Sequence, residues 1–468
     1  MSSPCTLGRA GWRRIDRRVD PMIEHQGGPP SKPLTLADWQ ANASQYLTGG
    51  MSSSFRANQF TGVPFYATHA RGPRIWDVTG KEYIDFFLCH GAVLLGHDEP
   101  AVRTAVQRSA EKGFYAGVDT IETIDLARKI CELVPAAETI RFVNSGTEGT
   151  LLALRLARGV TGRDKVLRVD GHFHGIQDYL MANNLASKVD ADNPGDRPSR
   201  PRGRTAGVPR VVEELTITVP WHNAELLETV LEQESGQVAA IIMNPIDYNN
   251  GVFVASPEYL HRVQALARKH GAVLIFDEVL CGFKTGPSCA QGYFGVTPDL
   301  CILGKALTND VPLAVVAGSR TIMDKIMDPH DPVIAGGTYS GNQLGVAAGN
   351  AVLDMIGEPG FYEPFLTRAE RFFSSLQELF DRFAFPAVVQ SLGAGFHIYV
   401  GTREPITDYH GLARRDWELT RRFFSSCIDH GLYFHTDFTV SFAHDPHTLD
   451  EALERFEAVL SEFEVTRD

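Results

Sequence analysis

The sequence lacks the features that mark several large classes of protein. Its seven cysteines are odd in number, scattered along the chain and without a C-x-x-C pair. This pattern excludes a disulfide framework and a cysteine zinc site, and it indicates reduced thiols in a cytoplasmic protein. No apolar run approaches the ~18 residues of a spanning helix, so we expect no membrane segment. The arginine-rich N-terminus has no apolar core and does not resemble a secretory signal.

Positive charge is also in short supply. Lys and Arg number 44 against 57 Asp and Glu, which gives a net charge of −13. This balance argues against a nucleic-acid or anionic membrane partner, because both need a positive surface. Any anion that the protein binds must be held by local geometry. The composition, 43% hydrophobic and 22% charged, is otherwise that of a globular protein with a substantial core.

Four segments differ in pattern along the chain. We expect residues 1–33 to form a disordered extension, because they end near a run of glycine and proline. Residues 34–80 combine one helix, over 36–47, with a short hairpin. In residues 81–335, short apolar strands alternate with amphipathic helices. In residues 336–468, long amphipathic helices precede short strands and a final helix, which indicates a second, α+β domain.

The alternating segment predicts an α/β domain with a mostly parallel sheet and helices on both faces. Its continuous apolar runs are typical of strands that are buried on both sides. The expected strands are Thr139–Val143, Lys165–Val169, Val238–Met243, Ala272–Phe276, Leu300–Leu303 and Ala314–Ala317. Residues 191–209, rich in proline, glycine and arginine, form either a solvated surface loop or a mobile lid.

Two local signals predict where elements begin. The hairpin strands are expected at residues 64–67 and 74–77, on either side of turn residues. The final helix is expected to start with a capping box, Thr448-x-x-Glu451.

Small residues follow the strand that ends at Val143. Ser145-Gly146-Thr147 stands before an apolar helix, where free backbone N–H groups and the positive helix end can bind an anion. The two hydroxyls would add donors. The same residues could equally form an ordinary helix cap.

Two acids, Asp277 and Glu278, follow the strand expected at 272–276. They lie at the carboxyl end of a strand, where open α/β sheets bind ligands. An acid there can pair with a cationic nitrogen of a cofactor. A helix cap or a salt bridge is the alternative interpretation.

A lysine, Lys305, follows the strand that ends at Leu303. Desolvation at such a position lowers the pKa of the amine, which can then form an imine. An anion site, an acid and a buried lysine at three strand ends together fit pyridoxal phosphate, which needs a phosphate site, a partner for its ring nitrogen and a lysine.

At this point the sequence resembles a known family. Residues 142–148, 277–279, 303–305 and 336–342 are similar to the signatures of class III pyridoxal-phosphate aminotransferases, in the branch of glutamate-1-semialdehyde 2,1-aminomutase and the β-amino-acid aminotransferases. The resemblance covers about residues 35–465. It implies fold type I, with a mainly parallel seven-stranded sheet in the large domain.

The resemblance also implies how the domains are built. Residues 81–335 would form the large cofactor-binding domain. The segment 34–80 would pack with residues 336–468 into the smaller domain.

The resemblance implies a set of cofactor contacts. Lys305 would bind pyridoxal phosphate covalently and move a proton, and Asp277 would keep the ring nitrogen protonated. The remaining contacts would be Val279 and Phe173 on the two ring faces, Asn249 at the ring hydroxyl, Ser145, Gly146 and Thr147 at the phosphate, and Gly337 and Thr338 at the phosphate of the neighbouring subunit. The last pair implies a homodimer with its active site at the subunit interface.

The substrate region departs from the family pattern. Arg56 falls where the family binds the substrate carboxylate, a task that suits bidentate arginine. His90 stands in the substrate region where the aminomutase has a tryptophan, and the stretch at 436–438 is shortened. Near the cofactor, Phe173 replaces a tyrosine and Asn244 a glutamate.

The resemblance therefore implies an aminotransferase that moves an amino group from an amino-acid donor to a keto or aldehyde acceptor. An aminomutase that moves the amine within one molecule, and a racemase or epimerase, use the same parts and stay open. A non-catalytic binding module would have been indicated by a missing lysine, but Lys305 is present. His172 and His174 lack a third ligand at useful spacing, so no metal site is expected.

Overall fold

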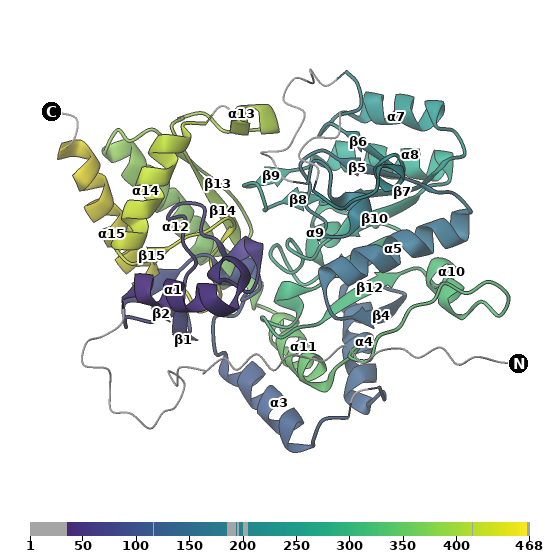
Figure 1. Ribbon diagram of the computed structural model, residues 1–468, viewed down its shortest axis with the longest axis horizontal. Helices are drawn as coiled ribbons and strands as arrows, with labels where there is room; N and C mark the ends of the chain where they lie inside the picture. The colour runs from purple at the N-terminus through teal and green to yellow at the C-terminus, as the bar shows by residue number, and fades with distance from the viewer. Residues whose placement is uncertain are drawn as a thin grey trace, which may run out of the picture.

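The computed structural model describes residues 35–115, 117–184, 193, 196–199, 205–413 and 415–465. The extension predicted at 1–33 lies outside the described residues, as does about half of the loop 191–209. Within the described residues the chain forms two lobes, one around a large sheet and one made of helices packed on small sheets (Figure 1). No helix in the described part of the chain is long and apolar enough to cross a membrane.

A seven-stranded sheet forms the centre of the first lobe. Its order is β4-β12-β11-β10-β7-β5-β6, and only β12 runs antiparallel to its neighbours. The bounds are β4 Thr139–Val143, β5 Lys165–Val169, β6 Thr216–Val219, β7 Val238–Met243, β10 Val273–Asp277, β11 Leu300–Leu303 and β12 Ala314–Gly318. The mainly parallel α/β fold is thereby confirmed. The sequence did not predict β6, because this half-buried edge strand alternates threonine with apolar residues instead of forming an apolar run.

Helices cover both faces of this sheet, as the continuous apolar strands require. Successive strand residues point to opposite faces. Ile242, Ile275 and Ile302 pack with the helix α5 (Gly146–Thr161) on one face. The residue before each of these packs with α8 (Pro257–His270) and its neighbours on the other face.

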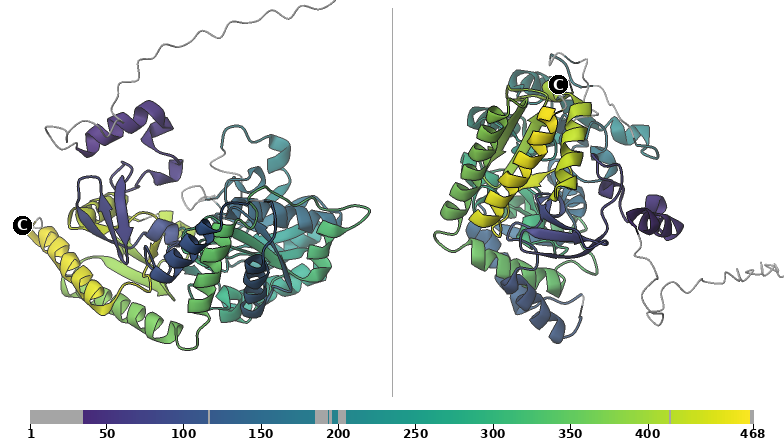
Figure 2. Two further views of the ribbon diagram at one scale, coloured as in Figure 1. Left: turned by 90° about the horizontal axis from the view of Figure 1, so that it is seen from below. Right: turned by 90° about the vertical axis from the view of Figure 1, so that its left-hand side faces the viewer.

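The second lobe packs three helices around the three-stranded sheet β13-β14-β16 (Figure 2). The bounds are α12 Tyr362–Arg382, α14 Trp417–Asp429, α15 Pro446–Val465, β13 Ala387–Leu392, β14 Gly395–Val400 and β16 Phe438–Thr439.

The remaining helices of six or more residues in the described part of the chain are α1 Leu36–Tyr46, α3 Pro100–Glu111, α4 Ile121–Leu133, α7 Ala224–Gln233, α9 Cys289–Phe294 and α11 Gln343–Ile356. Short elements are α2 Leu88–Gly91, α6 Arg210–Glu213, α10 Arg320–Met323, α13 Tyr409–Ala413, β8 Ile246–Asp247 and β9 Phe253–Val254.

The N-terminal segment joins the C-terminal part of the chain. The strands β1 (Ala67–Arg71), β2 (Arg74–Asp77) and β3 (Glu82–Asp85) form one sheet with β15 (Leu432–Tyr433), which runs parallel to β3. Phe86 follows β3 and stacks on Phe372 and Phe434, with ring centroids 5.5 and 5.2 Å apart. The two segments therefore share one aromatic core, while the domain boundaries at 80 and 335 stay a prediction.

Two local predictions were wrong. The first hairpin strand is β1 at Ala67–Arg71, not 64–67, since it pairs with β2 through the turn at Gly72. The final helix begins at Pro446, where Asp445 Oδ1 accepts the Thr448 N–H at 2.8 Å. Thr448 therefore lies inside the helix. The proposed capping partner, Glu451, pairs instead with Arg74 at 2.6 Å.

Candidate active site

A cavity of about 770 Å³ lies where residues of the two lobes meet. Eight of the predicted site residues line it: Arg56, His90, Ser145, Gly146, Phe173, Asn249, Val279 and Lys305. Four others, Thr147, Asp277, Gly337 and Thr338, are not among its lining residues.

The sheet explains why residues that are far apart in sequence meet here. The strands β4, β10 and β11 run in the same direction, so their carboxyl ends lie at one edge of the sheet. Ser145 follows β4, Asp277 ends β10, and Lys305 follows β11. This edge is where open α/β sheets bind their ligands.

The start of α5 forms the first part of the site. Ser145 caps this helix, with its Oγ accepting the Glu148 N–H at 3.2 Å. The N–H groups of Gly146 and Thr147 have no acceptor within the helix, because they belong to its first turn. A Cβ on Gly146 would lie 2.9 Å from the Val279 side chain, so only glycine lets the helix start this close to Val279. The helix cap and the predicted anion site therefore involve the same residues.

The Thr147 side chain contacts the protein just outside the lining of the cavity. Its Oγ1 accepts the Ile176 N–H at 3.3 Å, and a Cβ on Gly175 would lie 2.4 Å from the same oxygen. The hydroxyl therefore already has a partner in the protein. It fixes the start of α5 against the loop that carries Phe173.

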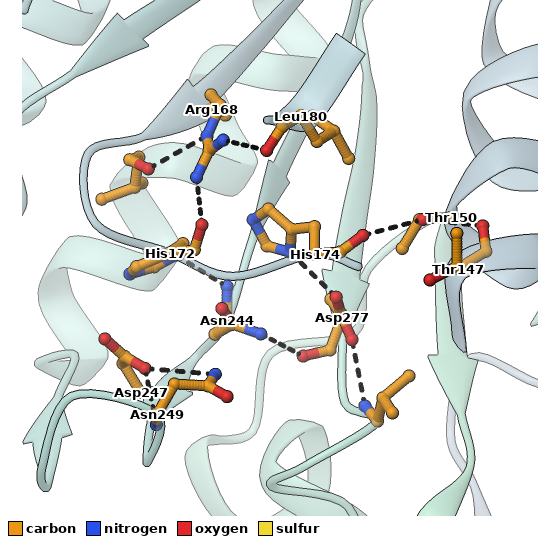
Figure 3. Close-up of polar contacts among 12 residues, drawn as sticks. Thr147, Thr150, Arg168, His172, His174, Leu180, Asn244, Asp247, Asn249 and Asp277 are labelled. Carbon is orange, nitrogen blue, oxygen red and sulfur yellow. Dashed lines mark hydrogen bonds and ion pairs between the residues drawn. The ribbon is translucent and has the colours of Figure 1, made fainter. Parts of the chain in front are cut away.

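Asp277 is held by three hydrogen bonds at the end of β10 (Figure 3). His174 Nδ1 lies 2.8 Å from Asp277 Oδ2, the Val279 N–H donates to Oδ1 at 3.1 Å, and Asn244 Nδ2 donates to the Asp277 carbonyl at 2.9 Å. Burial lowers the pKa of His174, so a neutral ring donates through Nδ1. Each carboxylate oxygen keeps lone pairs for a further donor.

The contact between His174 and Asp277 was not predicted from the sequence, in which His174 was weighed only as a metal ligand together with His172. Because His174 and Asp277 are 103 positions apart, only the fold shows that they meet.

Asn244 belongs to the same network. Its backbone N–H donates to His172 Nδ1 at 3.0 Å, and burial lowers the pKa of His172 well below its usual value. The Asn244 side chain, which stands where the resemblance implies a glutamate, donates through Nδ2 to the Asp277 carbonyl. Asn244 thus contacts His172 through its backbone and Asp277 through its side chain.

A buried arginine organises the loop in front of these histidines. Arg168 donates to the carbonyls of Leu180 and Ala182 at 2.6 and 2.7 Å, and to that of His172. Burial lowers the pKa of Arg168 to about 10. Several main-chain carbonyls thus surround the guanidinium and fix the loop that carries Phe173.

Asn249 lines the cavity and is held in place by a second buried carboxylate, that of Asp247. Asp247 Oδ1 accepts the Asn249 N–H at 2.9 Å, while Asp247 Oδ2 accepts from Asn250 and from the Tyr409 hydroxyl at 2.7 and 2.6 Å. Burial raises the pKa of Asp247. The turn at 247–250 is therefore rigid where it meets the cavity.

Lys305 lies directly after β11 in a left-handed backbone conformation, with φ of 49°. Its side chain lines the cavity. Burial lowers the pKa of the amine, and the charges of Asp437 and Asp277 partly oppose this shift. A lysine with a lowered pKa supplies the uncharged amine that nucleophilic chemistry needs.

A second buried lysine, Lys284, stands behind the cavity and was not predicted. Its Nζ donates to Thr439 Oγ1 at 2.8 Å and lies 4.8 Å from the centre of the Tyr248 ring. A Cβ on Gly91 would lie 2.4 Å from this nitrogen, so glycine makes room for the amine. Burial lowers the pKa of Lys284 to about 7, against the opposing charge of Asp437.

The predicted substrate residues lie on the side of the second lobe. Arg56 is exposed at the end of a short helical turn, Ser54–Arg56, and lines the cavity. His90 Nδ1 lies 3.0 Å from Asp437 Oδ2. Asp437 lies in the segment 436–438, which was predicted to differ from the family pattern only by being shortened.

Gly337 and Thr338 are exposed in this single chain. A Cβ on Gly337 would lie 3.7 Å from Nδ2 of Asn144, which itself lines the cavity. The structure thus brings this loop beside the start of α5.

Comparison with known proteins shows which family and which relatives the whole chain resembles. The family described as aminotransferase class-III matches residues 55–460. A glutamate-1-semialdehyde 2,1-aminomutase of Polynucleobacter necessarius subsp. necessarius (strain STIR1) is 35% identical over 418 residues, which are 88% of this chain and 95% of the relative.

Solved structures agree with this placement. An omega-transaminase from Sphaerobacter thermophilus superposes with a TM-score of 0.84 at 27% identity, over 93% of this chain and 98% of that one. A glutamate-1-semialdehyde-aminomutase from Pseudomonas aeruginosa PAO1 gives a TM-score of 0.79 at 22% identity, over 91% and 94% of the two chains. At this lower identity the likeness shows the shared fold alone.

Lys284 should make stability depend on pH. Its pKa is about 7 in the folded protein and ~10.4 when unfolded, so between these values the unfolded state binds the extra proton. The free energy of unfolding should therefore fall by up to about 1.4 kcal/mol per pH unit as pH drops from 10 to 7. Lys284→Met removes this loss. In urea unfolding, the free energy of unfolding of the variant minus that of the wild type should increase as pH drops from 10 to 7.

Lys269→Met is the matched control for this experiment. Lys269 is exposed and pairs with Glu228 at 2.7 Å, which raises its pKa. Its substitution should shift stability by a constant amount between pH 7 and 10. A constant difference for Lys284→Met as well would show that the buried amine does not titrate in this range.

Proposed function

The chain belongs to the class-III aminotransferase family, and we propose that it moves an amino group from a carboxylate-bearing amino donor to a keto or aldehyde acceptor. Enzymes of this family use pyridoxal phosphate, and pyridoxal-phosphate-dependent amino transfer is the activity of this chain. The position of Lys305 is the observation that carries our proposal of transfer from a carboxylate-bearing donor. Its amine lines the same cavity as the start of α5 and the proposed carboxylate-binding Arg56.

The residues present fit this cofactor. The start of α5 provides unpaired N–H groups for a phosphate, Lys305 an amine for an aldehyde, and Asp277 a carboxylate for a protonated ring nitrogen. We assign the remaining contacts as follows: Ser145, Gly146 and Thr147 to the phosphate, Phe173 and Val279 to the ring faces, and Asn249 to the ring hydroxyl. When bound, the cofactor supplies an electron sink for the charge left by the departing substrate proton.

The protein's own groups supply the proton chemistry. The Lys305 amine, whose pKa is lowered by burial, takes the proton from the substrate carbon that carries the amino group and returns it to the product. Asp277 stays fixed, because His174 and the Val279 N–H bind its two oxygens. Arg56 orients the substrate by pairing with its carboxylate.

Replacing Lys305 by alanine tests this proposal. The wild-type protein loaded with cofactor should show a spectral change on addition of glutamate or alanine, because the amino group passes to the cofactor. Lys305→Ala should slow this change by about a thousandfold, the middle of the range for loss of a proton-transferring group. Stopped-flow absorbance measures both.

Lys269→Ala, at an exposed lysine paired with Glu228, serves as the control and should react at the wild-type rate. Near wild-type rates in Lys305→Ala would refute the assignment.

In the same assay an amine without a carboxylate should react more slowly than glutamate, as the role of Arg56 requires.

Intramolecular transfer is the second candidate function. The 35% identity to a glutamate-1-semialdehyde 2,1-aminomutase favours it, whereas His90 and Asp437 in the substrate region distinguish this cavity from the pattern of that enzyme. The assay is conversion of glutamate 1-semialdehyde to 5-aminolevulinate with no added amino donor. We expect it to be slow compared with transfer from an external donor; rapid conversion would make the aminomutase the correct function.

We further propose that the protein is a homodimer in the cytoplasm. Exposed Gly337 and Thr338 support the first part, together with nearby Ile334, whose exposed fraction is 78%. The six cysteines in the described part of the chain are free, as in a reducing compartment. Light scattering should give twice the chain mass of 51.5 kDa, and a single-chain mass would contradict the dimer.

A further inference from the structure

We propose that His90 and Asp437 form a subsite that binds a hydrogen-bond donor, a hydroxyl or an ammonium group, which the substrate carries in addition to its reacting amine. This inference rests on the proposed amino transfer and names a substrate class for it. Both residues line the cavity that contains Lys305.

The pair has a fixed polarity. Asp437 Oδ2 lies 3.0 Å from His90 Nδ1, and a carboxylate can only accept, so the ring donates through Nδ1. In a neutral imidazole the other nitrogen, Nε2, is then an acceptor. It has no hydrogen-bond partner among the described residues.

The two side chains differ in exposure. The Asp437 side chain is 3% exposed and the His90 side chain 33%. The carboxylate is therefore the buried support, and the ring is the part that a substrate can reach. Phe87 and His435 hold the ring on two sides, with centroids 4.5 and 5.5 Å away.

The backbone that carries His90 is strained. Leu88, Cys89 and His90 have φ of 47°, 54° and 59°, a left-handed conformation that residues other than glycine seldom adopt. Asp85 Oδ1 stabilises the turn by accepting the N–H groups of Phe87 and Leu88 at 2.8 and 3.0 Å. Strain that is over-determined by its surroundings is typical of functional sites.

Asp437 keeps its charge although it is buried. Burial by itself would raise the pKa of this carboxyl, but the hydrogen bond from His90 and the nearby basic groups of His90, Lys305 and Lys284 outweigh it, and the pKa lies below its usual value. Lys284 reaches this place because Gly91, the residue after His90, has no side chain. The turn at 88–91 thus contributes His90, which bonds Asp437, and Gly91, which makes room for Lys284.

These features select the ligand. An imidazole acceptor backed by a carboxylate binds N–H or O–H groups and offers nothing to an alkyl chain. An apolar substrate would leave the pair desolvated without a partner, which sites of this kind discriminate against strongly. Hydroxyl and ammonium donors share the required chemistry.

Three amino donors with the same carbon skeleton test the inference: 2-aminobutyrate, homoserine and 2,4-diaminobutyrate. In the cofactor-loaded wild type, homoserine or diaminobutyrate should exceed aminobutyrate in kcat/KM by roughly ten- to a hundredfold, the range of one charge-assisted hydrogen bond. A preference for only one of the two polar donors identifies the hydroxyl or the ammonium as the recognised group. His90→Phe and Asp437→Asn should each reduce the ratio to about threefold or less.

His430→Phe is the matched control, because His430 forms a histidine–carboxylate pair with Glu462 on the surface, at 3.4 Å. It should keep the wild-type ratio. A purely structural role of His90 would lower kcat/KM for all three donors equally and leave the ratio unchanged, which would overturn the inference. Equal rates for the three donors in the wild type would also overturn it, as would no reaction with any of them when glutamate or alanine reacts.

Binding provides a readout that does not depend on turnover. Calorimetry on borohydride-reduced, cofactor-loaded protein should rank the three ligands in the same order, and His90→Phe should abolish the ranking. Absence of transfer from every donor would contradict the proposed function, whereas this ranking would still decide the subsite. Equal affinities for the three ligands would overturn the subsite alone.

Discussion

The site depends above all on burying one amine, Lys305, near two buried carboxylates, Asp277 and Asp437. Burial favours the uncharged amine, and the two carboxylates limit this effect without cancelling it. The balance can exist only where solvent is excluded, so it requires the two lobes to meet over the carboxyl edge of the sheet. Each of the other features, from the cap of α5 to the strained turn at His90, places a group around that amine.

Much of this arrangement could be predicted from local patterns. Six of the seven strands of the large sheet were predicted, several of them as continuous apolar runs, and the residues predicted to bind the cofactor lie at or just after the ends of three of them. Parallel strands bring such ends together, so Ser145, Asp277 and Lys305 could be grouped before any coordinates were known. The strand β6 was missed because an edge strand needs no apolar run, and the capping box was wrong because Asp445 provides an earlier cap.

The contacts that could not be predicted are those between distant segments. His174 reaches Asp277 only through the fold, and its sequence context indicated at most a weak metal ligand. Asp437 lies in a segment that was noted for being short, not for its charge. Lys284 and Arg168 were not predicted, because nothing in their local sequence indicates that each is a fully buried basic side chain with hydrogen-bond partners from other segments of the chain. Departures from a family pattern therefore showed where the cavity differs, and only the structure showed that two of them, at positions 90 and 437, form one pair.

We propose that Lys305, and not the second buried lysine, Lys284, is the amine that holds the cofactor. Borohydride reduction of the loaded protein, followed by proteolysis and mass spectrometry, tests this directly, because reduction makes the bond to the lysine permanent. We expect the added mass on the peptide that contains Lys305 and no label on Lys284. Label on Lys284, or on no lysine at all, would contradict it.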